Sequence, residues 1–512
     1  MATKIQAGQV IGLKGHIIDV EIDITGRALY NFAIVGLPDK AVEESKERIS
    51  AAIKNAGFLS PKRNQRTIVS LAPADIKKEG PVFDFAIALA YLAASKQLKF
   101  NADEKLFLGE LGLDGALRPI KGAVVLAQSA REKGIKELFL PEQNSDEAAL
   151  IKGLKIFGCK SLSQIIKHFR GEKIIEPKEA IRIEAEKNEN KFPIDFSDIK
   201  GQETAKRGLE IAAAGGHNVL MIGPPGTGKT MLAKAFSGIL PPLSFEEILE
   251  TTAIHSIAGI LNENFMTSRP FRNPHHTASY IALVGGGAWP KPGEITLAHR
   301  GVLLLDEFPE FDRRVIESLR QPLEDGFVSI SRSRGSLRFP ARFILICAMN
   351  PCPCGNLGSK TKPCICGQRD ILRYQRKISG PIIDRVDLWL EVPQVEHFKL
   401  ADEGQTGESS ETIRKRIIKA RKIQKERFSS DEEGGKGVLT NSEMGVRDLK
   451  LFAPLSEHVK QILISASKRL DLSGRLFHRI IKISRTIADL EGEKDINESH
   501  VFEALQYRPK NR

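Results

Sequence analysis

The chain has 512 residues, 41% of them hydrophobic and 27% charged, a composition typical of globular proteins with room for two or three domains. Its longest apolar run, 85–94, is shorter than the roughly 20 residues that a membrane span needs. Residues 1–16 lack the apolar core of a secretory signal. We therefore expect a soluble cytoplasmic protein without a membrane partner. The net charge of +12 is compatible with a polyanionic partner but identifies none.

Residues 1–170 are predicted to form one α/β domain. Apolar and polar residues alternate over 18–24, which indicates a strand with one buried face. Apolar residues recur at helical spacing over 40–56, and 83–94 is apolar enough for a buried helix. The next segment, 171–194, is rich in Lys and Glu and is predicted to be a charged linker or an exposed helix.

A glycine-rich loop dominates the second predicted domain, which spans 195–400. The apolar strand 219–222 leads into the loop and a helix follows from Met231, a context that argues against a chance glycine-rich turn. Glycines let backbone N–H groups contact phosphate oxygens, and the helix N-terminus faces the same anion. Lys229 is predicted to reach the β and γ phosphates of ATP, and Thr230 to bind Mg²⁺. The loop comprises Gly223, Pro224, Pro225, Gly226, Thr227, Gly228, Lys229 and Thr230.

Two further apolar strands of this domain end in polar side chains, and the alternation of strands with helices predicts a mostly parallel sheet. Residues 302–305 end in Asp306, which would hold Mg²⁺, and Glu307, which would polarise the attacking water. Without the phosphate loop, a helix cap after a core strand would explain these carboxylates better. Residues 343–349 end at Asn350, whose amide could orient the water or sense the γ phosphate; an ordinary turn asparagine is the alternative.

Four of the six cysteines occupy one short segment and form two C-x-C-G half-sites. Four thiolates suit tetrahedral Zn²⁺, which would stiffen the chain after Asn350. The spacing is shorter than the common C-x-x-C, so reduced free thiols, or a cluster or disulfide, are alternatives. The other two, Cys159 and Cys347, are predicted to pack as apolar residues. The clustered four are Cys352, Cys354, Cys364 and Cys366.

Several segments outside the phosphate loop carry a family resemblance. Residues 269–277 read Arg-Pro-Phe-Arg-Asn-Pro-His-His-Thr, and residues 379–388 read Ser-Gly-Pro-Ile-Ile-Asp-Arg-Val-Asp-Leu. The remaining segments are 201–202, 212–218, 285–287, 319–326 and 484–490. With these motifs, the sequence resembles the ComM/YifB type of magnesium-chelatase-like AAA+ proteins over nearly its whole length.

The resemblance implies the fold class α/β: an AAA+ P-loop core with a parallel sheet and a C-terminal helical lid, preceded by a Lon-protease-like α/β domain. The lid would span 438–512, after a polar connection with a basic helix at 401–437. Lon-like proteases use a Ser nucleophile with a Lys base. Val82 and Val124 occupy those positions here, and Lys121 lies three residues early, so the first domain is expected to be a scaffold or DNA-binding platform and not a protease.

The resemblance also implies a homo-hexamer with ATP at the subunit interfaces. Arg385 matches the arginine finger, whose fixed charge would neutralise the transition state at the neighbour's γ phosphate. Arg475 matches the second sensor arginine of the lid, and Arg479 is the competing candidate. A surface salt bridge is the alternative reading of either residue.

Two inserts of this family form loops that point into the pore of the ring. Residues 269–287 match the first; His275 and His276 within it are assigned a structural or pore role, because adjacent histidines rarely point the same way to bind a metal. Residues 331–338 resemble the second insert, a hairpin that could follow a DNA backbone without reading bases; contact with a neighbouring subunit is the alternative. Its arginines are Arg332, Arg334 and Arg338.

The expected function is an ATP-driven DNA motor, a helicase or branch-migration factor that promotes recombination in natural transformation. Its partners would be single-stranded or branched DNA and recombination proteins, and its cofactors ATP, Mg²⁺ and Zn²⁺. A chelatase-type motor subunit, which drives metal insertion into a tetrapyrrole, and a protein-remodelling ATPase are the rivals. The valines at the Lon-like positions argue against a protease, and the ATP motifs argue against a non-enzymatic DNA scaffold.

Overall fold

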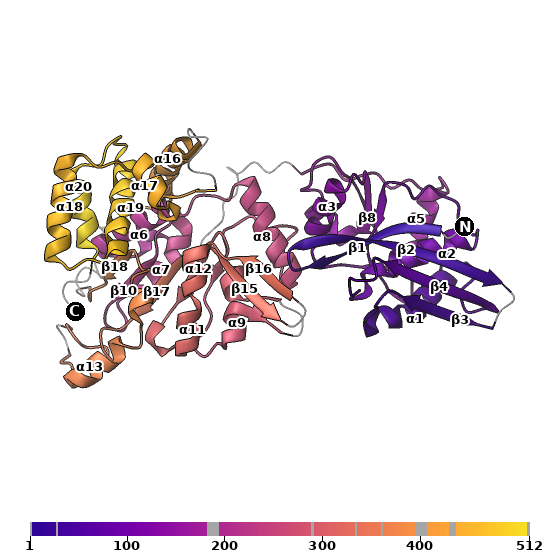
Figure 1. The fold of residues 1–512 in the computed structure, drawn as a ribbon, viewed down its shortest axis with the longest axis horizontal. Coiled ribbons are helices and arrows are strands. Elements are labelled where there is room, and N and C mark those ends of the chain that lie inside the picture. Colours follow the sequence, from indigo (N-terminus) through magenta and orange to yellow (C-terminus); the bar gives the residue numbers. More distant parts are fainter. Residues whose placement is uncertain are drawn as a thin grey trace. The chain divides into compact units, whose positions relative to one another are not determined.

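The computed structural model describes residues 3–26, 29–181, 194–287, 291–332, 335–359, 362–395, 407–429 and 437–508, with the backbone alone at 331, 332 and 335. The chain divides into two compact units, whose elements are labelled in Figure 1. Unit 1 comprises 1–185 together with 244–267, and unit 2 comprises 186–243 together with 268–512.

Unit 1 is built on a seven-stranded mixed sheet in the order β3-β4-β2-β1-β5-β8-β9. The long strands β1 and β2 pair antiparallel from Thr3 opposite Ile22 to Ile11 opposite Lys14. Ile18, Val20 and Ile22 are buried along one face of β2, which confirms the strand predicted from alternation. The strands are β1 (Thr3–Ile11), β2 (Lys14–Gly26), β3 (Asn31–Val35), β4 (Gln65–Ala72), β5 (Lys105–Phe107), β8 (Glu137–Pro141) and β9 (Lys155–Cys159), with the small hairpin β6 (Glu110–Leu111) and β7 (Leu117–Arg118).

The helices of unit 1 differ in how much of their surface they bury. α1 begins where the Asp39 carboxylate caps it by accepting from the Val42 N–H at 2.9 Å. α2 is apolar on every side and is buried over Asp84–Leu92, as its composition predicts. The helices are α1 (Lys40–Asn55), α2 (Asp84–Ala94), α3 (Ala123–Glu132), α4 (Ser145–Ala148), α5 (Leu162–Phe169) and α8 (Phe245–Ala258).

Helix α8 comes from the middle of the predicted ATPase core, yet it packs against α3 in unit 1. The Ser256 hydroxyl accepts from the Gly122 N–H at 2.8 Å, and the Asn264 amide donates to Asp146 at 2.8 Å. The boundaries predicted from the sequence are contiguous and do not anticipate this segment. Of the predicted linker, residues 171–181 contain no helix and bridge to β9 at Lys178, and 182–193 lie outside the described residues.

Unit 2 contains the predicted parallel sheet, in the order β11-β14-β17-β10-β18. Its apolar strands are buried, as expected for a parallel sheet covered on both faces. The carboxyl ends of these strands meet at one edge, where α/β proteins bind ligands. The strands are β10 (Val219–Ile222), β11 (Phe271–Arg272), β14 (Val302–Leu305), β17 (Ile344–Met349) and β18 (Leu388–Glu391), and two hairpins add β12 (Gly285–Gly286) with β13 (Lys291–Pro292) and β15 (Phe327–Arg332) with β16 (Gly335–Pro340).

The core helices of unit 2 pack on this sheet, with α6 and α7 contributing to one apolar core that extends into the C-terminal helices. The helices are α6 (Glu203–Gly215), α7 (Lys229–Ile239), α9 (Tyr280–Val284), α10 (Glu294–Leu297), α11 (Arg313–Ser318), α12 (Arg320–Asp325), α13 (Gln368–Gln375) and α14 (Gly380–Ile383).

The C-terminal part is helical, as predicted, and α17–α20 form the yellow group in Figure 1. Its polar centre is the buried Asp489 carboxylate, which accepts from Arg427 at 2.7 and 2.8 Å, from Asn441 at 2.8 Å and from Arg485 at 3.1 Å. This network accounts for Arg485 and Asp489 of the 484–490 motif. The helices are α16 (Ser410–Ser429), α17 (Val446–Phe452), α18 (Glu457–Arg469), α19 (Gly474–Glu491) and α20 (Glu498–Gln506). Within the ranges that the structure describes, no helix has the length and apolar character needed to cross a bilayer.

Candidate functional site

The phosphate loop connects β10, in the sheet, to α7. Gly226 and Gly228 have φ angles of 74° and 88°, a left-handed conformation that glycine adopts without steric cost. Gly223 is constrained by space, because a Cβ there would lie 2.1 Å from the carbonyl oxygen of Val392. α7 begins at Lys229, so the loop and the first helical N–H groups form the arrangement that binds phosphate.

The Lys229 side chain folds over this loop. Its Nζ donates to the carbonyl oxygens of Gly223 at 2.7 Å and Pro224 at 2.8 Å, and to Oδ1 of Asn350 at 3.2 Å. Burial lowers the pKa of the Lys229 ammonium, and the nearby charge of Asp306 opposes that shift. All three acceptors are neutral, which leaves the positive charge for a phosphate anion.

Thr230 and Asp306 present oxygen atoms of the kind that hold a magnesium ion. The Thr230 hydroxyl donates to Oδ2 of Asp306 at 2.6 Å, and Oδ1 of Asp306 accepts from the Glu307 N–H at 2.9 Å. Mg²⁺ in nucleotide sites takes one or two protein oxygens and completes its shell with water and phosphate oxygens. The two side chains therefore fit the ion predicted from the sequence.

Glu307 lies beside a histidine that the sequence interpretation did not connect with it. Nδ1 of His276 is 3.3 Å from Oε2 of Glu307. The rings of His275 and His276 have centroids 4.1 Å apart, so these neighbours do not point apart as expected. The contact arises because β11, which leads to His276, pairs with β14, which leads to Glu307. Glu307 also has a left-handed φ of 52°, which costs a non-glycine residue about 1 kcal/mol.

Asn350 follows β17 at the same sheet edge and is fixed from two sides. Its amide oxygen accepts from Lys229, and its backbone is hydrogen-bonded to the buried Tyr374 of α13. Burial raises the pKa of Tyr374 to about 12, so its phenol is neutral. The predicted sensor asparagine is thus linked both to the phosphate loop and to a helix outside it.

Arg385 and Arg475, the predicted finger and lid arginines, share one carboxylate. Arg385 is 7% exposed, donates from Nη1 to the Pro381 carbonyl at 2.7 Å, and pairs through Nη2 with Glu324. Arg475 pairs with the other oxygen of Glu324 at 3.2 Å. Glu324 itself belongs to the 319–326 motif and is half exposed.

Arg479, the competing lid arginine, pairs with Asp387 and donates to the Arg385 carbonyl at 3.0 Å. Asn218 donates to the same carbonyl at 3.1 Å and, through its backbone N–H, to Asp387 at 2.9 Å. Burial would raise the pKa of Asp387, but Arg479 and His217 hold it well below its usual range. The 212–218 and 379–388 motifs therefore meet at the backbone of Arg385, and Arg479 is hydrogen-bonded to the carbonyl of this predicted finger.

The four clustered cysteines come together as the spacing predicts. The sulfur atoms of Cys352 and Cys354 are 3.5 Å apart, each lies 3.6 Å from the sulfur of Cys364, and all four sulfur atoms lie within 4.8 Å of one another. Zn–S bonds of about 2.3 Å in a tetrahedron require S–S edges of about 3.8 Å, so the cluster could hold a metal ion. The Cys354 N–H also donates to the Cys366 sulfur at 3.4 Å, as expected of a thiolate site.

The described cysteines form no disulfide. Cys159 and Cys347 are buried, as predicted; burial raises the pKa of Cys159 to about 12 and that of Cys347 well above its ordinary value, so both stay thiols.

The cysteine loop touches the phosphate loop directly. Gly355 has a φ of 78°, and a Cβ added there would lie 2.6 Å from Cδ of Pro225 and 3.8 Å from the side chain of Asn350. A glycine is required because the Pro225 ring occupies the place of a side chain. The cluster therefore abuts the nucleotide site.

Arg338, on the predicted basic hairpin, is exposed, and its guanidinium carbon lies 4.8 Å from the ring centroid of Phe327 on the paired strand. β15 and β16 form the hairpin expected before the sensor strand. The side chain of Arg332 and the whole of Arg334 lie outside the described residues.

In unit 1, Val82 lies in a short 3₁₀ turn and is half buried, and Val124 is buried in α3. Neither side chain can act as a nucleophile or a base. Lys121 precedes α3, and its Nζ approaches Gly259, where a Cβ would lie 2.6 Å away. The non-catalytic role of this unit stays a prediction.

Comparison with known proteins places this site in a family. Residues 195–400 match the family described as magnesium chelatase, subunit ChlI, residues 20–144 match subunit ChlI of Mg-chelatase, and residues 407–508 match the ChlI C-terminal family. The competence protein ComM of Haemophilus influenzae is 43% identical over 97% of this chain and 96% of its own length.

Two other relatives differ in how much of the chain they match. The uncharacterized protein YifB of Escherichia coli is 41% identical over 97% of this chain and 95% of its own length. The 38 kDa magnesium-chelatase subunit of Cereibacter sphaeroides is 27% identical over 31% of this chain and 54% of its own length. With full-length matches at this identity and ChlI matches in all three regions, the chain belongs to the ComM/YifB-type magnesium-chelatase-like proteins of the AAA+ fold, a family of ATPase motors.

Proposed function

We propose that the chain is the subunit of a homo-hexameric ATPase ring that moves on single-stranded or branched DNA, as a helicase or branch-migration factor in recombination. The observation that carries the ATPase part is the meeting of the phosphate loop, Asp306, Glu307 and Asn350 at one edge of the parallel sheet. This arrangement supports the roles that the proposal assigns to these groups.

The residues have separate tasks in this proposal. The loop N–H groups and Lys229 bind the phosphates, and Thr230 with Asp306 would hold Mg²⁺, which offsets phosphate charge. Glu307 orients the attacking water, and His276 holds the Glu307 carboxylate. Arg385 of the next subunit neutralises charge on the γ phosphate as the bond to the leaving group breaks.

The DNA part is supported by the relatives and by charge. The 43% identical relative is named a competence protein, which points to DNA handling in natural transformation. The chain carries a net charge of +12, and Arg338 is exposed on the predicted pore hairpin. Recombination proteins are the partners that such an activity calls for.

A chelatase-type or protein-remodelling motor is the second candidate, because the family matches are to a chelatase subunit. The 38 kDa chelatase subunit matches only 31% of this chain, whereas the ComM match spans 97%, which favours the DNA motor.

The test measures ATP turnover without DNA, with single-stranded DNA and with forked DNA. The Glu307→Gln variant is measured in the same way as a control, and light scattering determines the oligomeric state. We expect hexamers, stimulation by DNA, and loss of turnover in the variant. DNA-independent turnover by a protein that binds no DNA at low salt would contradict the DNA motor and favour the second candidate.

The cysteine cluster is proposed to hold one Zn²⁺ per chain. Its S–S distances and N–H donors fit a tetrahedral thiolate site. Metal analysis of the purified protein tests this: we expect near-stoichiometric zinc, and metal-free protein with full stability would contradict it.

A further inference from the structure

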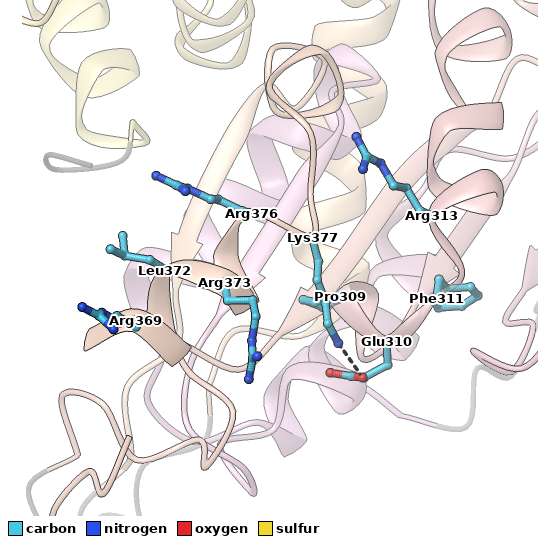
Figure 2. A pocket seen from close by; sticks show the side chains of 9 residues that line it. All are labelled: Pro309, Glu310, Phe311, Arg313, Arg369, Leu372, Arg373, Arg376 and Lys377. Atoms are coloured by element: carbon cyan, nitrogen blue, oxygen red, sulfur yellow. Dashed lines mark hydrogen bonds and ion pairs between the residues drawn. The ribbon is translucent and has the colours of Figure 1, made fainter. Parts of the chain in front are cut away.

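A basic groove of about 620 Å³ lies beside the ATP site in unit 2. One side is α13 and the residues after it, and the other is the segment that follows Glu307, from Pro309 to Arg313. Figure 2 shows Lys377, which follows α13, joined to Glu310, with Arg369, Leu372 and Arg373 of α13 on one side and Arg313 on the other.

The groove has an excess of positive charge. Its lining contains five cations, Arg313, Arg369, Arg373, Arg376 and Lys377, and one anion, Glu310. Lys377 pairs with Glu310 at 2.9 Å, and Arg373 pairs with Asp370 at 3.1 Å. Arg313, Arg369 and Arg376 are exposed and have no ion-pair partner within the described parts of the chain.

Two of these arginines, Arg369 and Arg373, lie on α13, and a third, Arg376, directly follows the helix with helical backbone angles. Positions 369, 373 and 376 are spaced i, i+4 and i+7, which places them on one face of the helix over roughly 10 Å. Phosphates of one strand of a duplex follow one another every 3.4 Å along the helix axis, so a row of this length can meet more than one phosphate. Tyr374, one residue from Arg373, is buried, and so is Phe311 of the lining, so neither ring is exposed for bases to stack on.

The groove is connected to the nucleotide site at two points. Tyr374 is hydrogen-bonded to the backbone of Asn350, whose side chain accepts from Lys229. The Lys377–Glu310 pair joins the residues just after α13 to the turn that begins right after Glu307. An anion that attracts Lys377 away from Glu310 would therefore act on two segments. One is linked to Asn350, the predicted sensor, and the other directly follows Glu307, the proposed catalytic glutamate.

We propose that this groove binds the phosphodiester backbone of a nucleic-acid strand, in addition to the contacts expected at the basic hairpin. This inference rests on the proposed DNA-motor function. Arginine suits this role because its planar fork matches phosphate geometry. Binding through the backbone is independent of base sequence, as a translocating motor requires. An acidic face of a neighbouring subunit is the competing occupant.

The experiment uses full-length protein and a fluorescent oligothymidylate strand, with dissociation constants measured by anisotropy at several salt concentrations. Arg369→Ala/Arg376→Ala is the test variant. Lys419→Ala/Lys422→Ala, on the exposed surface of α16, removes the same charge away from the groove lining. We expect the test variant to bind roughly tenfold more weakly, and its slope of log K against log salt to shrink by roughly 0.7 per lost contact, whereas the control variant keeps the wild-type slope.

Glu310→Gln provides the opposite arm. It removes the one anion of the groove and releases Lys377 for phosphate, so we expect tighter DNA binding and a steeper slope; a merely misfolded variant would not bind more tightly. Wild-type slopes in both groove variants would overturn this inference and leave the DNA motor standing. A test variant that fails to assemble would instead assign the groove to the subunit interface, and wild-type protein without DNA binding would overturn the proposed function as well.

Discussion

The imidazole of His276 lies 3.3 Å from the carboxylate of Glu307. It connects the segment 269–277, which leads toward the β12–β13 hairpin, with the residue proposed to orient the attacking water. A histidine in this position can hold the carboxylate in one direction, and movement of the segment would change that direction. The contact therefore offers a physical route between the predicted pore insert and ATP hydrolysis.

Replacing His276 with Ala should lower kcat for ATP hydrolysis about tenfold with little change in KM, because the lost contact positions the water and not the nucleotide. His276→Asn, which keeps a hydrogen-bond donor, should recover part of the rate. His275→Ala is the matched control, since Nδ1 of His275 meets the Thr277 hydroxyl at 2.9 Å. Equal losses in the two alanine variants, or a change confined to KM, would argue against a positioning role.

Arg385 should act on the nucleotide of the neighbouring subunit, so subunit mixing should rescue two inactive variants. Arg385→Ala and Glu307→Gln should each lower ATP turnover at least 100-fold as pure rings. Mixed rings contain interfaces with an intact Glu307 on one side and an intact Arg385 on the other, and turnover should reappear. The measurement is ATPase rate against mixing ratio, with subunit exchange verified by labelled protein. Exchange without recovery would show that Arg385 does not act in trans.

Local sequence patterns were sufficient for the elements of the ATP site and insufficient for the contacts between them. The strand that ends at Asp306 and the loop before Lys229 follow from apolar runs and glycine spacing, which are properties of neighbouring residues. The contacts of His276 with Glu307 and of Glu324 with two arginines depend on strand order and helix packing. The same holds for α8, whose Ser256 joins unit 1 through a contact with Gly122 that no local pattern encodes.

Removing the metal from the cysteine cluster should weaken nucleotide binding as well as stability. Chelation under reducing conditions should lower Tm and raise KM for ATP, because the loop that the cluster closes abuts Pro225 and Asn350. The Cys352→Ser/Cys364→Ser variant should show the same defects in the absence of chelator and should not respond to chelator further. A chelator effect of equal size in that variant would place the relevant metal elsewhere.

Gly355→Ala isolates the contact between the two loops without touching a metal ligand. The new Cβ would lie 2.6 Å from Cδ of Pro225, so the phosphate loop or the cysteine loop must shift. Gly358→Ala is the matched control, because Gly358 has the same left-handed φ of 78° but nothing within 4 Å of the added Cβ.

Both glycine variants should lose about 1 kcal/mol of stability through backbone strain. Only Gly355→Ala should also raise KM for ATP, by roughly tenfold for a loop displaced from its phosphate-binding geometry. If the two variants have the same KM, the close approach of Gly355 to Pro225 does not shape the nucleotide site, and the cysteine loop is a separate structural element.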